Sequence, residues 1–149
     1  PPEIVFAQNP GDLFVIRVAG NVVSPVQSGS VEFAVEHFGA QLVVVLGHSG
    51  CGAIRATLEE IRCPSENLSR NLRAIIEVVK PALQDVPIGD LEKVSEKEFQ
   101  QAVQKNIQSS ICHLREESAV VQQKINEQCL QVVGAEYCLE SGKVEWFLE

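Results

Sequence analysis

The stretch that decides the fold is QLVVVLGHSGCGAI, residues 41–54. Its apolar, β-branched part from Leu42 to Leu46 is typical of a strand that is buried on both faces of a parallel sheet. A turn with three glycines follows, and the next residues predict a helix from about Gly52 to Arg62. His48 and Cys51 lie between the glycines, at the carboxyl end of the predicted strand. Open α/β sheets bind their ligands at this end, so the two residues are the first candidates for a functional site.

The segment GHSGCGA is compatible with three kinds of chemistry. A serine nucleophile on a G-x-S-x-G elbow is a poor match, because Cys51 stands where the second glycine is needed. A cysteine nucleophile is an alternative, since the dipole of a helix favours a thiolate at its N-terminus. Phosphatase chemistry, however, needs an arginine after a longer anion-binding loop, and Arg55 comes only one helical turn later.

Metal binding is the third chemistry that this segment allows. Thiolate and imidazole are ligands that zinc prefers, and the glycines let His48 and Cys51 converge on one ion. The spacing alone is equally compatible with a buried thiol beside a hydrogen-bonded histidine. From these residues by themselves, the metal site and the structural pair therefore remain alternatives.

The rest of the chain predicts alternating strands and helices. The expected elements are a strand at 12–18, a helix from Ser28 or Ser30 to Phe38 ended by Gly39, a helix at 67–83 bent or ended by Pro81, a loop at 85–90, a helix from the capping box of Ser95 and Glu98 to about Leu114, a short helix at 119–127, a strand at 130–139 and a returning strand at 143–148. This order predicts a single α/β domain over 1–149, with a mostly parallel sheet flanked by helices and an antiparallel C-terminal edge strand.

Composition excludes several classes of protein. The 149 residues are 45% hydrophobic and 21% charged, which indicates one ordered globular domain. A net charge of −8 argues against binding to nucleic acid or to anionic membranes. No apolar run is long enough to span a membrane and no leader pattern opens the chain, so we expect a cytoplasmic or other soluble, reducing compartment, including an organelle or microcompartment. Five cysteines at irregular spacing favour free thiols or metal ligands over disulfides.

Three segments of the chain match segments of a single enzyme family. PPEIVFAQNPGDLFVIRVAGN (1–21) is similar to the family segment that follows its first active-site motif. SGSVEFAVEHFGAQLVVVLGHSGCGA (28–53) resembles the family's central helix, strand and second zinc motif. VVGAEYCLESGKVEWF (132–147) resembles the closing hairpin, with Cys138 in place of the usual aspartate. In this order and spacing the segments resemble the β-class carbonic anhydrases, and the resemblance covers nearly the whole chain.

The resemblance implies a β-carbonic-anhydrase-like fold and zinc-dependent, reversible hydration of carbon dioxide to bicarbonate and a proton. By position, His48 and Cys51 match two of the family's three protein ligands to Zn2+, and Gly52 matches a backbone amide near the substrate. Phe14 and Phe33 match positions that line the CO2 pocket, which the family builds partly across a dimer interface. The resemblance thus implies a homodimer or higher homo-oligomer. In the family, zinc lowers the pKa of its bound water to about 7, so that hydroxide can attack CO2.

One family motif has no counterpart in this sequence. A Cys-x-Asp-x-Arg motif supplies the family's third zinc ligand and a catalytic Asp–Arg pair, and it lies on a central strand just upstream of the segment that Pro1 to Glu3 match. We therefore expect a domain that lacks its N-terminal part and first central strand, with impaired activity. The alternative is a non-catalytic binding or structural homologue of the same fold, with weak or no zinc.

The other metal-binding or titratable side chains are expected to have structural roles. These are Cys63, Cys112, Cys129 and Cys138 as free cysteines, His37 and His113 as surface or packing residues, Asp12 at the far end of its strand, and Arg17 in an ion pair or interface.

Overall fold

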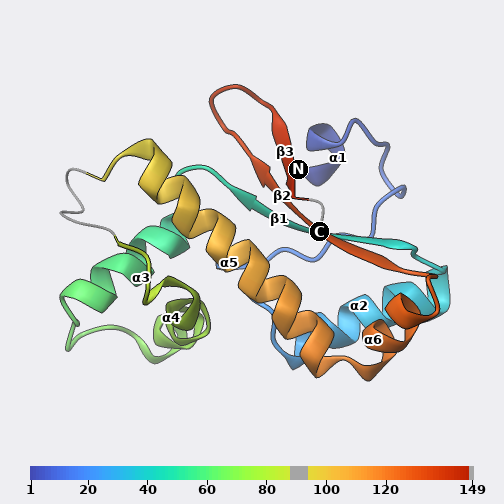
Figure 1. The fold of residues 1–149 in the computed structure, drawn as a ribbon, viewed down its shortest axis with the longest axis horizontal. Helices are drawn as coiled ribbons and strands as arrows, with labels where there is room; N and C mark the ends of the chain where they lie inside the picture. Colours follow the sequence, from blue (N-terminus) through green and yellow to red (C-terminus); the bar gives the residue numbers. More distant parts are fainter. Residues whose placement is uncertain (88–93, 148–149) are drawn as a thin grey trace.

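The computed structural model describes residues 1–87 and 94–147. Its elements are α1 (Pro2–Val5), the 3-10 turn η1 (Ala19–Asn21), α2 (Pro25–Phe38), β1 (Leu42–His48), α3 (Gly52–Arg62), α4 (Arg70–Leu83), α5 (Glu96–Glu117), α6 (Ala119–Asn126), β2 (Gln131–Tyr137) and β3 (Val144–Phe147). Figure 1 shows the small sheet with α5 running across it, α3 and α4 at one end of α5, and α2 and α6 at the other.

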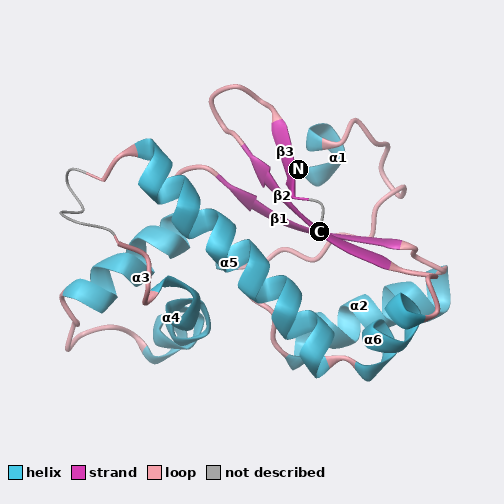
Figure 2. Cartoon of the chain, in the orientation of Figure 1, coloured by secondary structure: helices cyan, strands magenta, loops and turns pink. Residues whose placement is uncertain are grey.

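The sheet has the order β1-β2-β3 within the described residues. β1 and β2 are parallel, with Leu42 opposite Gln131 and His48 opposite Tyr137. β3 pairs antiparallel with β2 at the edge of the sheet. The prediction of an α/β fold, with a sheet flanked by helices and an antiparallel C-terminal edge strand, is confirmed (Figure 2). In the described residues the sheet contains one parallel and one antiparallel pair.

Helix α5 lies so close to the sheet that two strand positions must be glycine. A Cβ atom at Gly47 would lie 2.7 Å from Cδ1 of Ile107, and one at Gly134 would lie 2.8 Å from its Cγ2. These distances are shorter than carbon–carbon contacts allow. The helix can therefore lie this close to the sheet only because Gly47 and Gly134 have no side chains. Ile107 is completely buried at this contact.

The termination of α2 and the start of α5 follow from local sequence signals. Gly39 ends α2 in the left-handed conformation, with φ of 66°, as glycine allows. The Ser95 side chain accepts a hydrogen bond from the Glu98 N–H, and the Glu98 carboxylate accepts one from the Ser95 N–H. The predicted capping box is therefore formed, and α5 runs three residues beyond the predicted end at Leu114.

Two predicted helix boundaries are wrong. Helix α2 begins at Pro25 and not after Ser28 or Ser30, because proline at the first helical position already has the helical φ angle. Helix α4 begins at Arg70 and not at Asn67, because the Ser69 side chain caps the N–H of Leu72.

The strand predicted at 12–18 is also wrong. Residues 14–18 form neither helix nor strand, and they pair with no strand in the described part of the chain. An apolar run becomes a strand only when a neighbour accepts its hydrogen bonds, and local sequence does not contain that information. The segment leaves Phe14, Val15 and Ile16 exposed.

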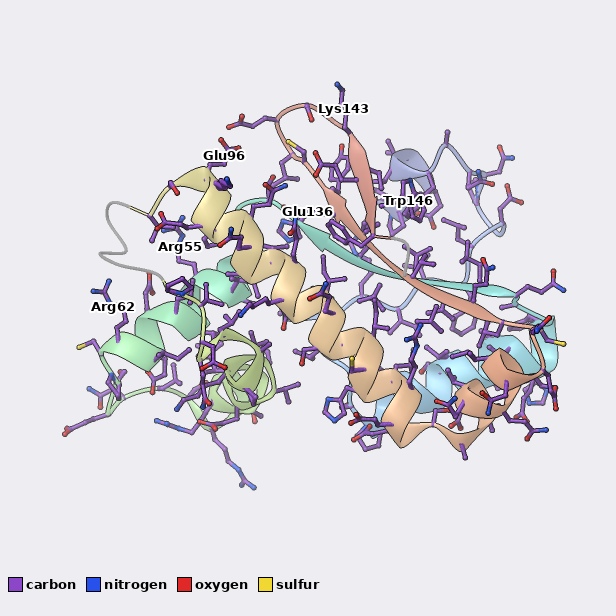
Figure 3. The ribbon with its side chains drawn as sticks, viewed as in Figure 1. Arg55, Arg62, Glu96, Glu136, Lys143 and Trp146 are labelled. Carbon is purple, nitrogen blue, oxygen red and sulfur yellow. The ribbon has the colours of Figure 1, made fainter. Side chains whose placement is uncertain are left out.

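Helix α1 lies near the C-terminal strand β3. Phe6, which follows α1, contacts Trp146 of β3 with ring centres 5.8 Å apart, so α1 lies beside the edge strand (Figure 3). The predicted loop at 85–90 and the end of the predicted strand at 143–148 fall partly outside the described residues. Of the helices described, none combines the length and apolar character that crossing a membrane requires.

Candidate metal centre

His48 and Cys51 lie at the junction of β1 and α3. His48 is the last residue of β1 and is exposed, whereas Cys51 precedes the first residue of α3 and is only 5% exposed. Ser49 and Gly50 form the turn between them, and Gly50 has a φ of +65°, which favours glycine. The carbonyl of Cys51 accepts the Arg55 N–H at 3.1 Å, so the first turn of α3 fixes the backbone of the cysteine.

The ring of His48 is oriented by a backbone carbonyl. Its Nδ1 atom lies 2.9 Å from the carbonyl oxygen of Ser49. A carbonyl can only accept a hydrogen bond, so Nδ1 carries the proton and Nε2 of the neutral ring keeps its lone pair. Histidines that bind metals are commonly oriented in this way, with the second ring nitrogen bonded to a carbonyl or carboxylate.

The donor set suits zinc but is small. An imidazole with a free Nε2 and a buried free thiol are two ligands of the kind that zinc takes. Over residues 1–87 and 94–147, no group of three or more His, Cys, Asp or Glu side chains could hold a metal ion. Catalytic zinc sites use three protein ligands. The described residues therefore fit zinc as two of its donors.

The β2–β3 hairpin lies against the turn that carries the two donors. The N–H of Ser49 donates to the carbonyl of Tyr137 at 3.0 Å, and the N–H of Leu139 donates to Oγ of Ser49 at 2.9 Å. Cys138 lies between these two partners, and its thiol has a lowered pKa because the hydroxyl and backbone of Ser141 hydrogen-bond to it. The hairpin thus brings a second thiol to the carboxyl end of the parallel strands.

Phe14 and Phe33 lie together in an exposed aromatic patch. The ring centres of Phe14 and Phe33 are 6.5 Å apart, and Phe38 lies 5.8 Å from the first and 5.5 Å from the second. The three side chains are 49%, 48% and 67% exposed, respectively. His37 stacks at 4.4 Å on Phe33, in agreement with a packing role. We refer to Phe14, Phe33, His37 and Phe38 as the aromatic patch.

Gly52, His113 and the other four cysteines make few contacts that bear on a functional site. Gly52 opens α3 directly after Cys51, and no atom of the described residues lies within 4 Å of the position that its Cβ would take. His113 pairs with Glu117 at 3.1 Å on the surface of α5. Cys63, Cys112 and Cys129 are exposed and free, and Cys138 is half-buried and free.

A buried carboxylate near His48 escaped sequence reasoning. Glu136 of β2 is 4% exposed and accepts a hydrogen bond from Nε2 of Gln104 at 3.4 Å, where α5 crosses the sheet (Figure 3). Burial raises the pKa of its carboxyl group, the nearby Glu145 adds to the rise, and the hydrogen bonds and His48 oppose it. The available signal was a glutamate inside the apolar run VVGAEY, at an inward-facing position of the strand.

Comparison with known proteins decides the family. The model of the family described as "Carbonic anhydrase" matches residues 1–144. The chain belongs to the β-class carbonic anhydrase family. It is 36% identical over 143 residues to the carbonic anhydrase of Mycolicibacterium smegmatis, covering 96% of this chain and 66% of that protein. It is 33% identical over 141 residues to carbonic anhydrase 2 of Mycobacterium tuberculosis, and this match covers 95% of this chain and 65% of that protein. The chain thus spans just under two thirds of the length of these relatives.

Solved β-carbonic anhydrases have the same fold as this family member. The Coccomyxa β-carbonic anhydrase in complex with acetazolamide aligns with a TM-score of 0.81 at 25% identity, covering all of this chain and 67% of the other. One of two tetrameric β-carbonic anhydrases from Sordaria macrospora aligns with a TM-score of 0.82 at 22% identity, and the alignment covers 99% of this chain and 74% of the other. The recognition of the family from the three quoted segments is confirmed.

Proposed function

We propose that this protein catalyses the reversible hydration of carbon dioxide to bicarbonate, with Zn2+ held in part by His48 and Cys51. The observation that carries the proposal is the orientation of His48, whose Nδ1 is bonded to a carbonyl while Nε2 is left free. Membership of the carbonic anhydrase family supports the reaction. The free, buried thiol three residues later supports zinc over the harder cations, which prefer oxygen ligands.

The residues of the chain have separate roles in this proposal. His48 supplies Nε2 and Cys51 supplies Sγ to the metal, and the N–H of Gly52 faces the substrate. Phe14 and Phe33 form the apolar wall against which CO2 binds. When bound, zinc would supply a water molecule whose pKa is lowered to about 7.

A second candidate is a non-catalytic homologue that holds zinc weakly or not at all. It is favoured by the absence of a third donor beside the pair in the described residues. Two ligands hold zinc far more weakly than three or four. This candidate predicts substoichiometric zinc in the purified protein and no hydration of CO2 above the uncatalysed rate.

Stopped-flow measurement of CO2 hydration, with zinc quantified in the same samples, tests the proposal. We expect His48→Ala and Cys51→Ala to abolish both zinc retention and hydration. His113→Ala, at a half-buried position of α5, and Cys129→Ala, at an exposed position, remove the same types of side chain elsewhere and are the matched controls. An active, zinc-loaded Cys51→Ala variant would refute the ligand assignment, and a zinc-free, inactive wild type would favour the second candidate.

We also propose that the protein is a homo-oligomer, and that the aromatic patch and the neighbouring segment 14–18 lie in the interface. Three half-exposed phenylalanines beside exposed Val15 and Ile16 form an apolar surface that a monomer rarely leaves uncovered. The outer edge of β1 has no partner strand in the described residues, and such edges favour association with another chain.

Light scattering with size-exclusion chromatography tests the oligomer. Phe38→Asp should dissociate it, because burial of an unpaired carboxylate in an apolar interface is costly. Ile4→Asp, at a comparably exposed apolar position of α1, is the control. A monomeric wild type, or equal dissociation by both variants, would contradict the assignment.

A reducing compartment fits the cysteine chemistry. All five cysteines are free and three of them are exposed, and exposed thiols persist where glutathione and thioredoxin keep them reduced. Thiol trapping during isolation followed by mass spectrometry should find every cysteine alkylated. A native disulfide would contradict this proposal.

A further inference from the structure

Ser49, the residue next to His48, engages all three of its strongly polar groups. Its N–H donates to the carbonyl of Tyr137 at 3.0 Å, its Oγ accepts the N–H of Leu139 at 2.9 Å, and its carbonyl accepts from Nδ1 of His48 at 2.9 Å. The first two partners belong to the β2–β3 hairpin, about ninety residues away in the sequence. One serine therefore connects the hairpin to the imidazole ring.

The first of these bonds continues the parallel pairing of β1 and β2 by one residue. His48 is opposite Tyr137 in the register, so the bond from the Ser49 N–H to the Tyr137 carbonyl belongs to the regular hydrogen-bond pattern of parallel strands. The bond from Leu139 is different, because only a side-chain oxygen at position 49 can accept it. An alanine at this position would keep the ladder bond and lose the connection to the hairpin beyond β2.

The turn needs this connection because its own backbone is permissive. Gly50 has a φ of +65° and no side chain, so the peptide unit between Ser49 and Gly50 can rotate at little steric cost. Among the described residues, nothing lies within 4 Å of the position that a Cβ of Gly50 would take, so no neighbouring atom restricts this glycine. Rotation of that peptide unit would move the Ser49 carbonyl away from Nδ1 and release the ring.

We propose that Ser49 is a positioning residue that fixes the tautomer and orientation of His48 by tying the donor turn to the hairpin. The hydrogen bond from the Leu139 N–H to the Ser49 Oγ fixes Ser49. The carbonyl of Ser49 then stays directed at Nδ1 of His48 and accepts its proton in a hydrogen bond. Nε2 of His48 is thereby kept unprotonated and free. The use of that nitrogen by zinc rests on the proposed function. The fixing of the ring does not, and it can be measured without metal.

Nitrogen-15 NMR of the metal-free protein, above the titration range of histidine, measures the tautomer of His48 directly. We expect wild type to show the Nδ1–H tautomer and Ser49→Ala to show a mixture with the Nε2–H form. Ser49→Thr keeps the hydroxyl and should restore the wild-type signal. Ser141→Ala removes a hydroxyl from the same hairpin, where it contacts the N–H of Lys143, and should leave His48 unchanged.

Two further readouts exclude a merely structural effect. Amide exchange at Leu139 should accelerate in Ser49→Ala and not in Ser49→Thr or Ser141→Ala. Zinc affinity should fall about tenfold in Ser49→Ala, the lower end of what loss of an outer-shell partner causes, and recover in Ser49→Thr. An unchanged tautomer and unchanged Leu139 exchange in Ser49→Ala would overturn the inference. If the tautomer shifts as expected but wild type binds no zinc, the proposed function fails and the positioning role stands.

Discussion

Glu136 on β2 lies directly opposite Glu145 on β3, and a glutamine of α5 donates a hydrogen bond to each carboxylate. Gln104 bonds Glu136 at 3.4 Å and Gln100, one helical turn earlier, bonds Glu145 at 3.3 Å. Like charges at directly opposite positions of an antiparallel pair are unfavourable. The buried member of the pair is therefore the one that resists ionisation.

This pair predicts how stability depends on pH. Burial raises the pKa of Glu136 in the folded protein, so the folded state binds its proton more tightly than the unfolded chain does. The resulting stabilisation is complete below the ordinary glutamate pKa of about 4.3 and is lost as pH rises through the raised value. Glu136→Gln should flatten this dependence in denaturant titrations and be more stabilising, relative to wild type, at pH 8 than at pH 4. If Glu136→Gln were instead more stabilising at pH 4 than at pH 8, the carboxyl group of Glu136 would ionise readily in the folded protein.

Gly47 should not tolerate a side chain. Gly47→Ala would place a methyl group 2.7 Å from Ile107, and overpacking of this kind costs about 1–3 kcal/mol of unfolding free energy. Gly29→Ala, in an exposed and open position of α2, should instead stabilise by about 0.5–1 kcal/mol through helix propensity. Equal effects in chemical denaturation would show that α5 does not press on β1 as described.

Ser118 connects the corner between α5 and α6 to α2. Its Oγ accepts the N–H of Val121 at 3.0 Å and donates to Glu32 at 2.6 Å, and the residue is fully buried. Ser118→Ala should cost about 2 kcal/mol or more of unfolding free energy, because it removes a buried helix cap and a part-buried hydrogen bond to Glu32. Ser69→Ala removes only the exposed cap of α4 and should cost about 1 kcal/mol. If chemical denaturation showed a smaller loss of unfolding free energy for Ser118→Ala than for Ser69→Ala, Ser118 would not connect the three helices in this way.

Cys138 should be a reactive thiol. Hydrogen bonds from Ser141 and the backbone lower its pKa, so a larger fraction is thiolate at neutral pH. Peptide mapping after brief treatment with iodoacetamide should find Cys138 modified before the buried Cys51. Ser141→Ala should slow the reaction at Cys138 and leave the exposed Cys129 unaffected. An unchanged rate would show that Ser141 does not set the reactivity.

Local signals made much of the fold predictable. The β-branched run of β1, the glycine that ends α2 and the capping box of α5 each act within a few residues, and the structure contains all three. His48 and Cys51 could be singled out as candidates for the same reason, since only Ser49 and Gly50 separate them in the sequence.

Features that depend on distant partners were not predictable. Residues 12–18 have a strand-like composition, but strand formation depends on a neighbouring chain segment that composition does not specify. The Ser49–Leu139 bond joins residues ninety positions apart, and the pairing of Glu136 with Glu145 appears only once the hairpin register is known. In each case the missing information was which segments lie side by side.

The most direct test of the central claim is X-ray absorption at the zinc edge, on zinc-loaded wild type and on Cys51→Ala. We predict a sulfur ligand at about 2.3 Å and imidazole nitrogen at about 2.0–2.1 Å in wild type, with loss of sulfur scattering in the variant. A wild-type spectrum without sulfur, or sulfur scattering that survives in Cys51→Ala, would contradict the assignment of His48 and Cys51 as the metal donors.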